Sequence, residues 1–497
     1  MKPLIKLTAL LLSLTILSGC GQNQIGEKQA FNPNITEEVV QPRSQKEEKA
    51  ELLKIACNYD KLVASPWNCP DLNTRKSASL LYDSPVRLGT DFKAEPFLVD
   101  ISGGQALWTL TPKPGIKFTD GSELTAQDIN NSLAMALAEG SFYRNRLVNI
   151  ASYKVVGESV QITLLQPDAL FANLLTFPVA KATENGYIGT GRYQYSFREG
   201  SSVFLEKNPS HPGPASGIEK IELKDLHKKG VASYSLKLGE IDCLYTEENR
   251  SDLTTVSTSD YPAVKNQLVF LGLNAGRGPT VNPLLRKILN LALDREALVQ
   301  AALSSSAVPA ENPLHPNFYP QNKELMKGRT PDITRKSLLD SGFMTEEKPL
   351  SLKLLYCSDN QDRAQTANQV SAQLTEAGIE VILDPRPEAE YFALLEAGNY
   401  DLYLGEVLLG DDMDLSHILM RGERYGYGTG ISEKLLNSYR TAFASGQGWD
   451  VFLTDFREES PVIPLAFRNG TLSFTREHSF LVTSTANDLF YNIDQWQ

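Results

Sequence analysis

The second half of the chain constrains the fold most, because short apolar segments alternate there with segments of helical length. In order along the chain, the predicted strand, helix, strand, helix and strand are Leu352–Tyr356, Asp362–Ala377, Ile379–Leu383, Pro387–Ala397 and Tyr400–Leu404. Gly378 and Gly398 follow the two helical segments, where glycine commonly ends a helix. Strands joined by helices of this length pair in parallel through right-handed crossovers. This region therefore predicts an α/β lobe.

An acidic segment, Gly405–Asp414, directly follows the last of these strands and contains Asp411, Asp412 and Asp414. In open α/β sheets, ligands lie beyond the carboxyl ends of the strands. We interpret the three aspartates as a candidate site for a cation, a ligand ammonium or a metal, while a solvated acidic loop explains the same residues. The spacing does not match an EF-hand.

The first half of the chain predicts mixed strands and one clear helix. Thr125 and Asp128 form a capping-box pattern. Apolar residues of the expected helix follow on one face: Ile129, Leu133, Ala136 and Leu137. Alternation in 155–165 predicts a hairpin. Farther on, Asn282 and Pro283 predict the start of one helix, and Asp294 the start of another that reaches Leu303.

The N-terminus has the pattern of a bacterial lipoprotein signal. Lys2 and Lys6 precede the apolar core Leu7–Leu17, which is shorter than a membrane span, and Leu17-Ser18-Gly19-Cys20 follows. We expect residues 1–19 to be a signal peptide that is cleaved before Cys20, whose thiol receives the lipid. An uncleaved anchor or an unlipidated secreted form remains an alternative.

Residues 20–50 are rich in polar side chains and proline and predict a flexible tether. With a lipid on Cys20, the expected location is extracytoplasmic, on the outer face of the cytoplasmic membrane or in the periplasm. The net charge of −12 argues against nucleic acid as a partner. No second apolar run of the sequence is long enough to cross a membrane.

Four cysteines remain after Cys20, and none of them forms a CxxC pair, which argues against a zinc or redox site. Cys57 and Cys69 are either a short disulfide or buried free thiols. The five histidines are scattered, and no HExxH, P-loop or GxSxG motif is present. We therefore expect no enzyme activity, no metal site and no cofactor.

Several motifs resemble the dipeptide/oligopeptide-type family of substrate-binding proteins of ABC importers, the family 5 extracellular solute-binding lipoproteins. GIKFTDGSELTAQDINNSLAMAL (Gly115–Leu137) is similar to the family's GVKFxDGxPLTAxDVxxSL pattern. Three further stretches agree in order: Gly189–Pro209, Val269–Leu303, and the pair NYDLYLGEV and ESPVIPLAFRNG (Glu459–Gly470). The resemblance covers roughly residues 50–497.

The resemblance implies an α/β, two-lobed periplasmic-binding-protein-like fold of type II, in its large peptide-binding subclass, with mixed β-sheets. Lobe I is expected at 51–270 with an inserted subdomain at about 86–185, and lobe II at 271–462. Residues 463–497 are expected to return to lobe I. The hinge is expected in Gln267–Asn274 and Pro461–Phe467. Hinge closure traps a ligand through contacts that only the closed state makes.

For the ligand site, the resemblance implies that Asp411 pairs with the ligand's α-ammonium, because a buried ammonium needs a charged partner. Asp412 and Asp414 lie beside it. The family's usual tryptophan falls on Leu408 and its usual proline on Leu415, which departs from the pattern. Aromatic residues that are expected to line the cleft are Tyr59, Trp67, Tyr82, Tyr425 and Tyr427.

The implied function is that of a lipid-anchored, monomeric binding protein that captures short peptides and delivers them to ABC permease subunits, with the membrane contacted through Cys20. One alternative is binding of a nickel chelate or another small solute, for which His417 beside Asp414 is the candidate residue. A peptide-sensing receptor without import is another.

Overall fold

The computed structural model describes residues 52–226, 231–247, 258–303, 307–318, 330–420, 430–475 and 481–496, which all belong to the unit Glu48–Gln497. The predicted signal peptide, Cys20, the tether, Tyr425 and Tyr427 lie outside the described residues. None of the helices in the described ranges combines the length and the apolar character that crossing a bilayer requires.

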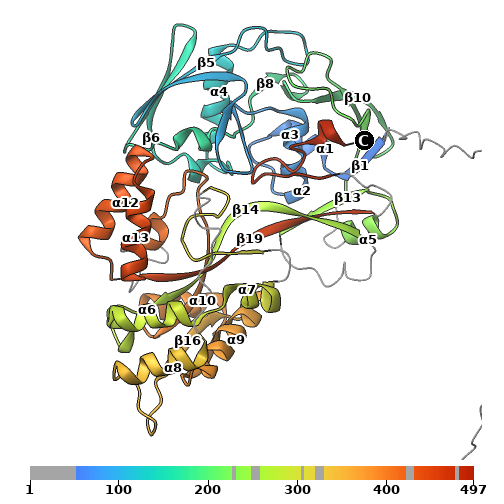
Figure 1. Cartoon of the computed structure of the whole chain (residues 1–497). Helices are drawn as coiled ribbons and strands as arrows, with labels where there is room; N and C mark the ends of the chain where they lie inside the picture. The colour runs from blue at the N-terminus through green and yellow to red at the C-terminus, as the bar shows by residue number, and fades with distance from the viewer. Residues whose placement is uncertain are drawn as a thin grey trace, which may run out of the picture. The chain divides into compact units, whose positions relative to one another are not determined.

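The largest sheet of the described part is mixed and has eleven strands. Its long strands β14 (Thr258–Leu273) and β19 (Val462–Thr475) pair antiparallel and lie side by side (Figure 1). Gln267 lies opposite Arg468, and Gly272 opposite Val462, so both predicted hinge segments lie on this pair of strands. On the β19 side follow β13 (Cys243–Thr246), β1 (Leu52–Ala56), β12 (Lys220–Lys224), β11 (Ser202–Lys207) and β10 (Tyr193–Glu199). On the β14 side follow β18 (Leu402–Leu408), β16 (Ser351–Cys357) and β17 (Glu380–Arg386), while β15 (Ala307–Pro309) pairs with β19.

The predicted α/β lobe is confirmed by the pairing of β16, which is parallel to both β17 and β18. Alternate residues of β16 point to opposite faces of the sheet. Leu352 and Leu354 pack in the core that contains α9 (Gln361–Glu376), whereas Leu355 and Cys357 pack in the core that contains α10 (Glu388–Glu396). Burial on both faces explains why this strand is almost wholly apolar.

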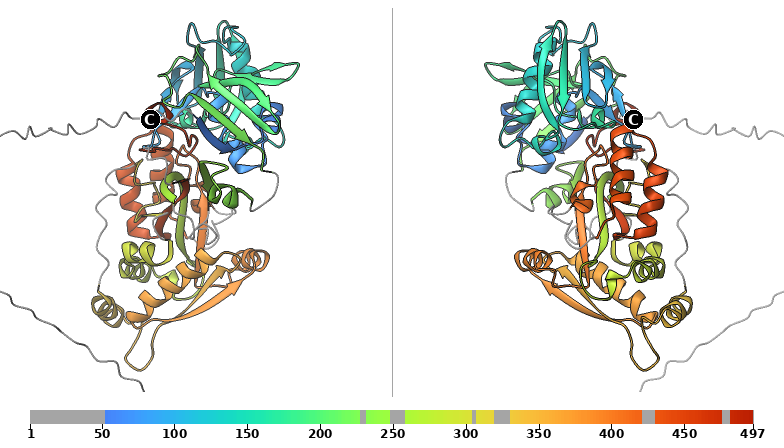
Figure 2. Two further views of the ribbon diagram at one scale, coloured as in Figure 1. Left: turned by 90° about the vertical axis from the view of Figure 1, so that its right-hand side faces the viewer. Right: turned by 90° about the vertical axis from the view of Figure 1, so that its left-hand side faces the viewer.

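Two helices close to the C-terminus, α12 (Glu433–Ser445) and α13 (Trp449–Glu459), pack against each other and lie side by side in both views of Figure 2. Their apolar faces share a core with Leu268 and Phe270 of β14. The same core takes in Leu88 and Phe92 from the first half of the chain. Segments that the sequence separates widely therefore meet here.

The predicted inserted subdomain contains a separate antiparallel sheet in the order β4 (Val99–Gly104), β5 (Leu107–Pro112), β7 (Ser159–Leu164) and β6 (Ile150–Val156). Helix α4 (Ala126–Leu137) packs against β5, β6 and β7. Thr125 and Asp128 form the predicted capping box, and Ile129, Leu133 and Ala136 are buried. The helix and the hairpin of β6 and β7 are confirmed.

Both predicted helix starts in this part of the chain are present. Asp294 caps a helix by accepting from the Ala297 N–H group (3.0 Å), but α7 (Arg295–Leu298) gives way to the π-helix η5 (Val299–Leu303). The helix predicted from Asp294 to Leu303 is therefore confirmed in extent, and its second half is π-helical. At the other predicted start, Asn282 accepts from the Leu284 N–H group (2.9 Å) and caps α6 (Pro283–Ala292), as expected.

Shorter elements complete the described part. Trp496 and Phe490 pack in the same core as Leu53 of β1, in line with the predicted return of the C-terminus to lobe I, although the lobe boundaries stay a prediction. The remaining helices are α1 (Tyr59–Ala64), α2 (Leu72–Lys76), α3 (Ala78–Leu81), α5 (Val231–Lys237), α8 (Pro331–Asp340), α11 (Ser416–Leu419), η1 (Arg144–Arg146), η2 (Phe171–Leu174), η4 (Pro279–Val281) and η8 (Ile493–Gln495). The remaining strands are the pairs β2 (Val86–Leu88) with β3 (Ala94–Pro96) and β8 (Ala180–Thr183) with β9 (Gly186–Gly189).

Cys57 and Cys69 are buried free thiols in this structure, which is one of the two alternatives that the sequence left open. Burial raises the pKa of both groups, that of Cys69 to about 11. Both thiols are therefore protonated at neutral pH and are poor nucleophiles.

Candidate functional site

The acidic segment follows the end of β18 and is hydrogen-bonded to Asn266 of β14. Leu408, the last residue of β18, is 52% exposed. The Asn266 side chain donates from Nδ2 to the Gly410 carbonyl oxygen (2.7 Å). The backbone carbonyl oxygen of Asn266 accepts from the Leu409 N–H group (2.8 Å). These two hydrogen bonds hold the segment that carries the predicted aspartates against β14.

Asp411 is buried and contacts residues from two distant parts of the chain. Its Oδ2 atom accepts from Asn487 Nδ2 (2.9 Å) and lies 3.5 Å from Arg146 Nη1. Asn173 donates from Nδ2 to the Asp411 carbonyl oxygen (2.9 Å). The carboxylate that the sequence assigned to a ligand thus has a guanidinium and an amide of the protein beside it.

Asp412 and Asp414 belong to a different environment, a cluster of carboxylates with Asp168. Asp168 is fully buried, and its Oδ2 atom has no hydrogen-bond partner among the described residues. Burial, and after it the charge of Asp414, raise the pKa of Asp168 to about 7. Burial and then the charge of Asp168 raise the pKa of Asp412 well above its usual range. Like charges this close favour a shared proton. Asp414 accepts from the hydroxyl group of Tyr439 (2.8 Å).

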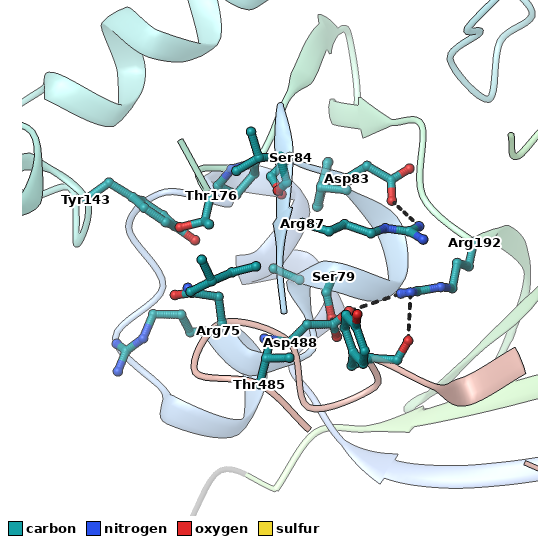
Figure 3. Close-up of a pocket in the computed structure, with 17 residues that line it drawn as sticks. Arg75, Ser79, Asp83, Ser84, Arg87, Tyr143, Thr176, Arg192, Thr485 and Asp488 are labelled. Atoms are coloured by element: carbon teal, nitrogen blue, oxygen red, sulfur yellow. Dashed lines mark hydrogen bonds and ion pairs between the residues drawn. The ribbon is translucent and has the colours of Figure 1, made fainter. Parts of the chain in front are cut away.

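A polar cavity of about 570 Å³, counted with its part open to solvent, lies between the α2–α3 region and the C-terminal segment 485–491 (Figure 3). Tyr82, one of the predicted aromatic residues, lines it and donates its hydroxyl proton to the Tyr187 carbonyl oxygen (2.8 Å). Asn487 also lines the cavity, so it connects this space with Asp411.

Two ion pairs form much of the cavity wall. Arg87 contacts Asp83 at 3.3 Å, and Arg192 contacts Asp488 at 3.2 Å (Figure 3). Burial opposes ionisation of Asp83, but the hydrogen bond and charge of His211, together with the arginines, lower its pKa to about 2. Asp83 is therefore ionised at neutral pH, and the two ion pairs make this part of the wall better suited to a polar solute than to an apolar one.

A second, smaller cavity of about 230 Å³ lies beside β18 and the start of α9. It is lined by an ion network, defined here as Asp362, Arg363, Glu406 and Arg468. Arg468 contacts Asp362 at 2.5 Å and Glu406 at 3.2 Å, and Arg363 contacts Glu406 at 3.1 Å. Two guanidiniums meet two carboxylates, so the ion network is balanced.

His417, the candidate residue for a nickel chelate, is exposed on α11. In the described ranges, no three histidine, cysteine, aspartate or glutamate side chains are grouped in a way that would hold a metal ion.

The mixed sheet with its two long antiparallel strands, β14 and β19, agrees with the two-lobed α/β fold that is expected for a solute-binding protein. Residues 77–420 match the sequence profile of the bacterial extracellular solute-binding proteins, family 5 Middle. The chain belongs to this family. The resemblance stated from the motifs is confirmed, and so is the prediction that the chain is not an enzyme, because the family consists of binding proteins.

Known proteins similar to this chain bind small solutes. The glutathione-binding protein of Pectobacterium atrosepticum is 25% identical over 356 residues, which are 64% of this chain and 65% of that protein. The chain thus spans just under two thirds of that relative's length.

Solved structures agree with the predicted fold. The unliganded open form of a periplasmic murein tripeptide-binding protein has a TM-score of 0.74 at 17% identity and covers 90% of this chain and 97% of its own. A nickel ABC transporter from Bacillus halodurans has a TM-score of 0.71 at 17% identity, and the match covers 88% of this chain and 98% of that protein's chain. At this identity the likeness shows the fold alone, and it confirms the two-lobed α/β class.

Several residues of the site were not found from the sequence. Arg146, Asn487 and Asp168 belong to none of the motifs, and Arg146 and Asn487, which contact each other, are 341 positions apart in the chain. Of the predicted residues, Asp411, Asp412 and Asp414 follow one another closely but face different partners, and Tyr82 lies in the cavity of Figure 3.

Proposed function

We propose that the protein is the lipid-anchored extracytoplasmic binding component of an ABC importer, and that it captures short peptides by closure of two lobes and delivers them to a permease. The observation that carries the proposal is the family 5 match over residues 77–420. The similarity to proteins named for binding glutathione and a murein tripeptide favours a peptide as the ligand.

Asp411 is the residue that we propose for the ligand's ammonium group. Its carboxylate lies 3.5 Å from Arg146, a distance too long for a strong charge-assisted hydrogen bond. An ammonium that reaches Asp411 at a shorter distance would replace this contact. The two ion pairs in the wall of the cavity in Figure 3 favour a polar ligand of this kind.

A nickel chelate is the second candidate, favoured by the likeness of the fold to a nickel ABC transporter. Native mass spectrometry of the chain as the cell produces it, purified in mild detergent, distinguishes the two. Co-purifying masses of short peptides would support the main proposal. A nickel-containing adduct would favour the second candidate, and the absence of any ligand from cells grown in peptide-rich medium would count against both.

Anchoring is tested separately with Cys20→Ala. The wild-type chain is expected in the membrane fraction, because a diacylglycerol with further acylation anchors stably. The variant should be released to the soluble or secreted fraction, and incorporation of labelled palmitate should be lost. Equal membrane association of both chains would contradict the lipoprotein proposal.

A further inference from the structure

Two cationic side chains from distant parts of the chain converge on the consecutive residues Ala486 and Asn487. Lys76, the last residue of α2, donates from Nζ to the Ala486 carbonyl oxygen (2.9 Å). Arg146, the last residue of η1, donates from Nη1 to Asn487 Oδ1 (2.9 Å). Because the two acceptors belong to neighbouring residues, the charged groups are brought together, and the charge of Arg146 acts on Lys76.

The four side chains Arg75, Lys76, Arg146 and Lys265 are called the cation cluster here. The carboxylates around them carry less negative charge than the cluster carries positive charge. Asp411 contacts Arg146 at 3.5 Å, and Glu247 pairs with Lys265 at 3.4 Å. Arg75 and Lys265 both add positive charge near Lys76. Among the described side chains, four cations thus face two carboxylates. The two cations without a carboxylate in direct contact lie over aromatic rings, Arg75 over Phe142 (4.0 Å to the ring centre) and Lys76 over Tyr245 (5.4 Å), so the positive charge of the cluster exceeds its negative charge.

Unmatched charge away from water is unfavourable unless an opposite charge compensates it. Burial, followed by the charge of Arg146, lowers the pKa of Lys76 to about 8, so most molecules still carry the proton at neutral pH. The Arg146 side chain is 33% exposed, which makes the pair reachable from solvent. In the described residues, Lys76 uses one of its three N–H groups and Arg146 donates only from Nη1, so donors remain for a ligand.

We propose that Lys76 and Arg146 bind an anionic oxygen group of the ligand, such as the carboxylate of a short peptide. This inference rests on the proposed function, since it assumes that a solute enters the space beside Asp411, and it adds the charge of the group that is recognised. Ammonium binding at Asp411 would deprive Arg146 of its carboxylate and strengthen the need for this anion. A peptide C-terminus and a carboxylate-rich chelator share the required chemistry.

Isothermal titration of the full chain with three matched peptides tests the charge requirement. Trialanine and N-acetyl-trialanine retain the carboxylate, whereas trialanine amide lacks it. The amide is expected to bind at least about tenfold more weakly than trialanine, because charge-assisted hydrogen bonds are lost. Equal affinity of the amide and the free acid would overturn the inference.

Variants of Lys76 test whether this residue binds the anionic group of the ligand. Lys76→Met should bind trialanine roughly tenfold more weakly and should distinguish the acid from the amide less than the wild type does, because Arg146 remains, while Lys76→Arg should retain the full distinction. Lys154→Met removes an exposed lysine on β6 and serves as the matched control. Undiminished discrimination in Lys76→Met would contradict the assignment.

A third measurement does not depend on peptide binding. Lysine acylation by an amine-reactive label, read by mass spectrometry, is expected to slow at Lys76 when propionate replaces chloride, and to stay unchanged at Lys154. If none of the peptides binds but propionate protects Lys76, the peptide proposal fails and the anion site stands. If propionate leaves Lys76 labelling unchanged, the anion site is overturned whatever the peptides do.

Discussion

The ion network beside β18 and the cation cluster around Ala486 are both assembled from residues far apart in the sequence, but they differ in charge balance. In the ion network, Arg468 and Glu406 have side chains only 5% and 6% exposed, and each charge meets an opposite charge. In the cation cluster, four cations face two carboxylates and Arg146 is 33% exposed. A balanced, buried network stabilises the fold, whereas an unbalanced and reachable cluster leaves charge for a ligand to compensate.

The largest expected effect is on stability, in the balanced network. Arg468 is the cation that contacts the buried Asp362 in the described residues, so Arg468→Met leaves that carboxylate without an ion-pair partner there. The free energy of unfolding should fall by about 3–5 kcal/mol. Urea unfolding measures this loss. Arg198→Met, which removes an exposed pair with Asp60, should unfold like the wild type. An equal loss in both variants would remove the distinction between structural and surface charge.

The carboxylate cluster of Asp168, Asp412 and Asp414 is the opposite of the cation cluster and should make stability depend on pH. The folded-state pKa of Asp168, about 7, lies above its ordinary value. Its contribution to stability is therefore fully present below about pH 4 and is lost as the pH rises through about 7. Asp168→Asn should reduce this loss by an amount on the order of 2 kcal/mol.

The measurement for the carboxylate cluster is urea unfolding across this pH range. Asp100→Asn, at an exposed position on β4, is the control and should leave the pH profile unchanged. A profile for Asp168→Asn that is as steep as that of the wild type would show that Asp168 is ionised in the folded protein. The contrast between the carboxylate cluster, which holds a proton, and the cation cluster, which remains charged, would then be wrong.

The smallest stability effect is expected in the cation cluster itself. Lys76→Met removes a cation whose lowered pKa indicates an unfavourable ionised state, but it also removes the hydrogen bond to Ala486. These contributions oppose each other, so thermal unfolding at neutral pH should change by less than about 1 kcal/mol. A loss as large as that of Arg468→Met would place Lys76 among the structural charges.

Much of the fold could be predicted because its signals are local. The capping box of α4 needs only Thr125 and Asp128, which are three residues apart, and the parallel order of β16, β17 and β18 follows from crossovers of helical length. The helix expected from Asp294 to Leu303 is present, but its π-helical second half was not predicted, because a capping residue indicates where a helix starts and not whether its later turns keep α-helical hydrogen bonds.

The site could be predicted only in part, for the same reason. The position of the acidic segment beyond β18 was evident, and the resemblance singled out Asp411, but nothing in the sequence indicated which protein groups Asp411 and Asp412 contact. In the structure, Asp411 faces Arg146 and Asn487, whereas the charge of Asp168 acts on Asp412. Their partners come from other segments, so no spacing in the acidic segment indicates them.

The sequence by itself determined the family, the α/β character and the place of the acidic segment, since motifs, capping residues and strand–helix alternation act over a few residues. Only the tertiary structure decided which charges meet. Lys76 and Ala486 are 410 residues apart, yet their groups lie within hydrogen-bond distance. Electrostatic energy depends on separation in space, and the chain's path through β14 and β19 sets that separation.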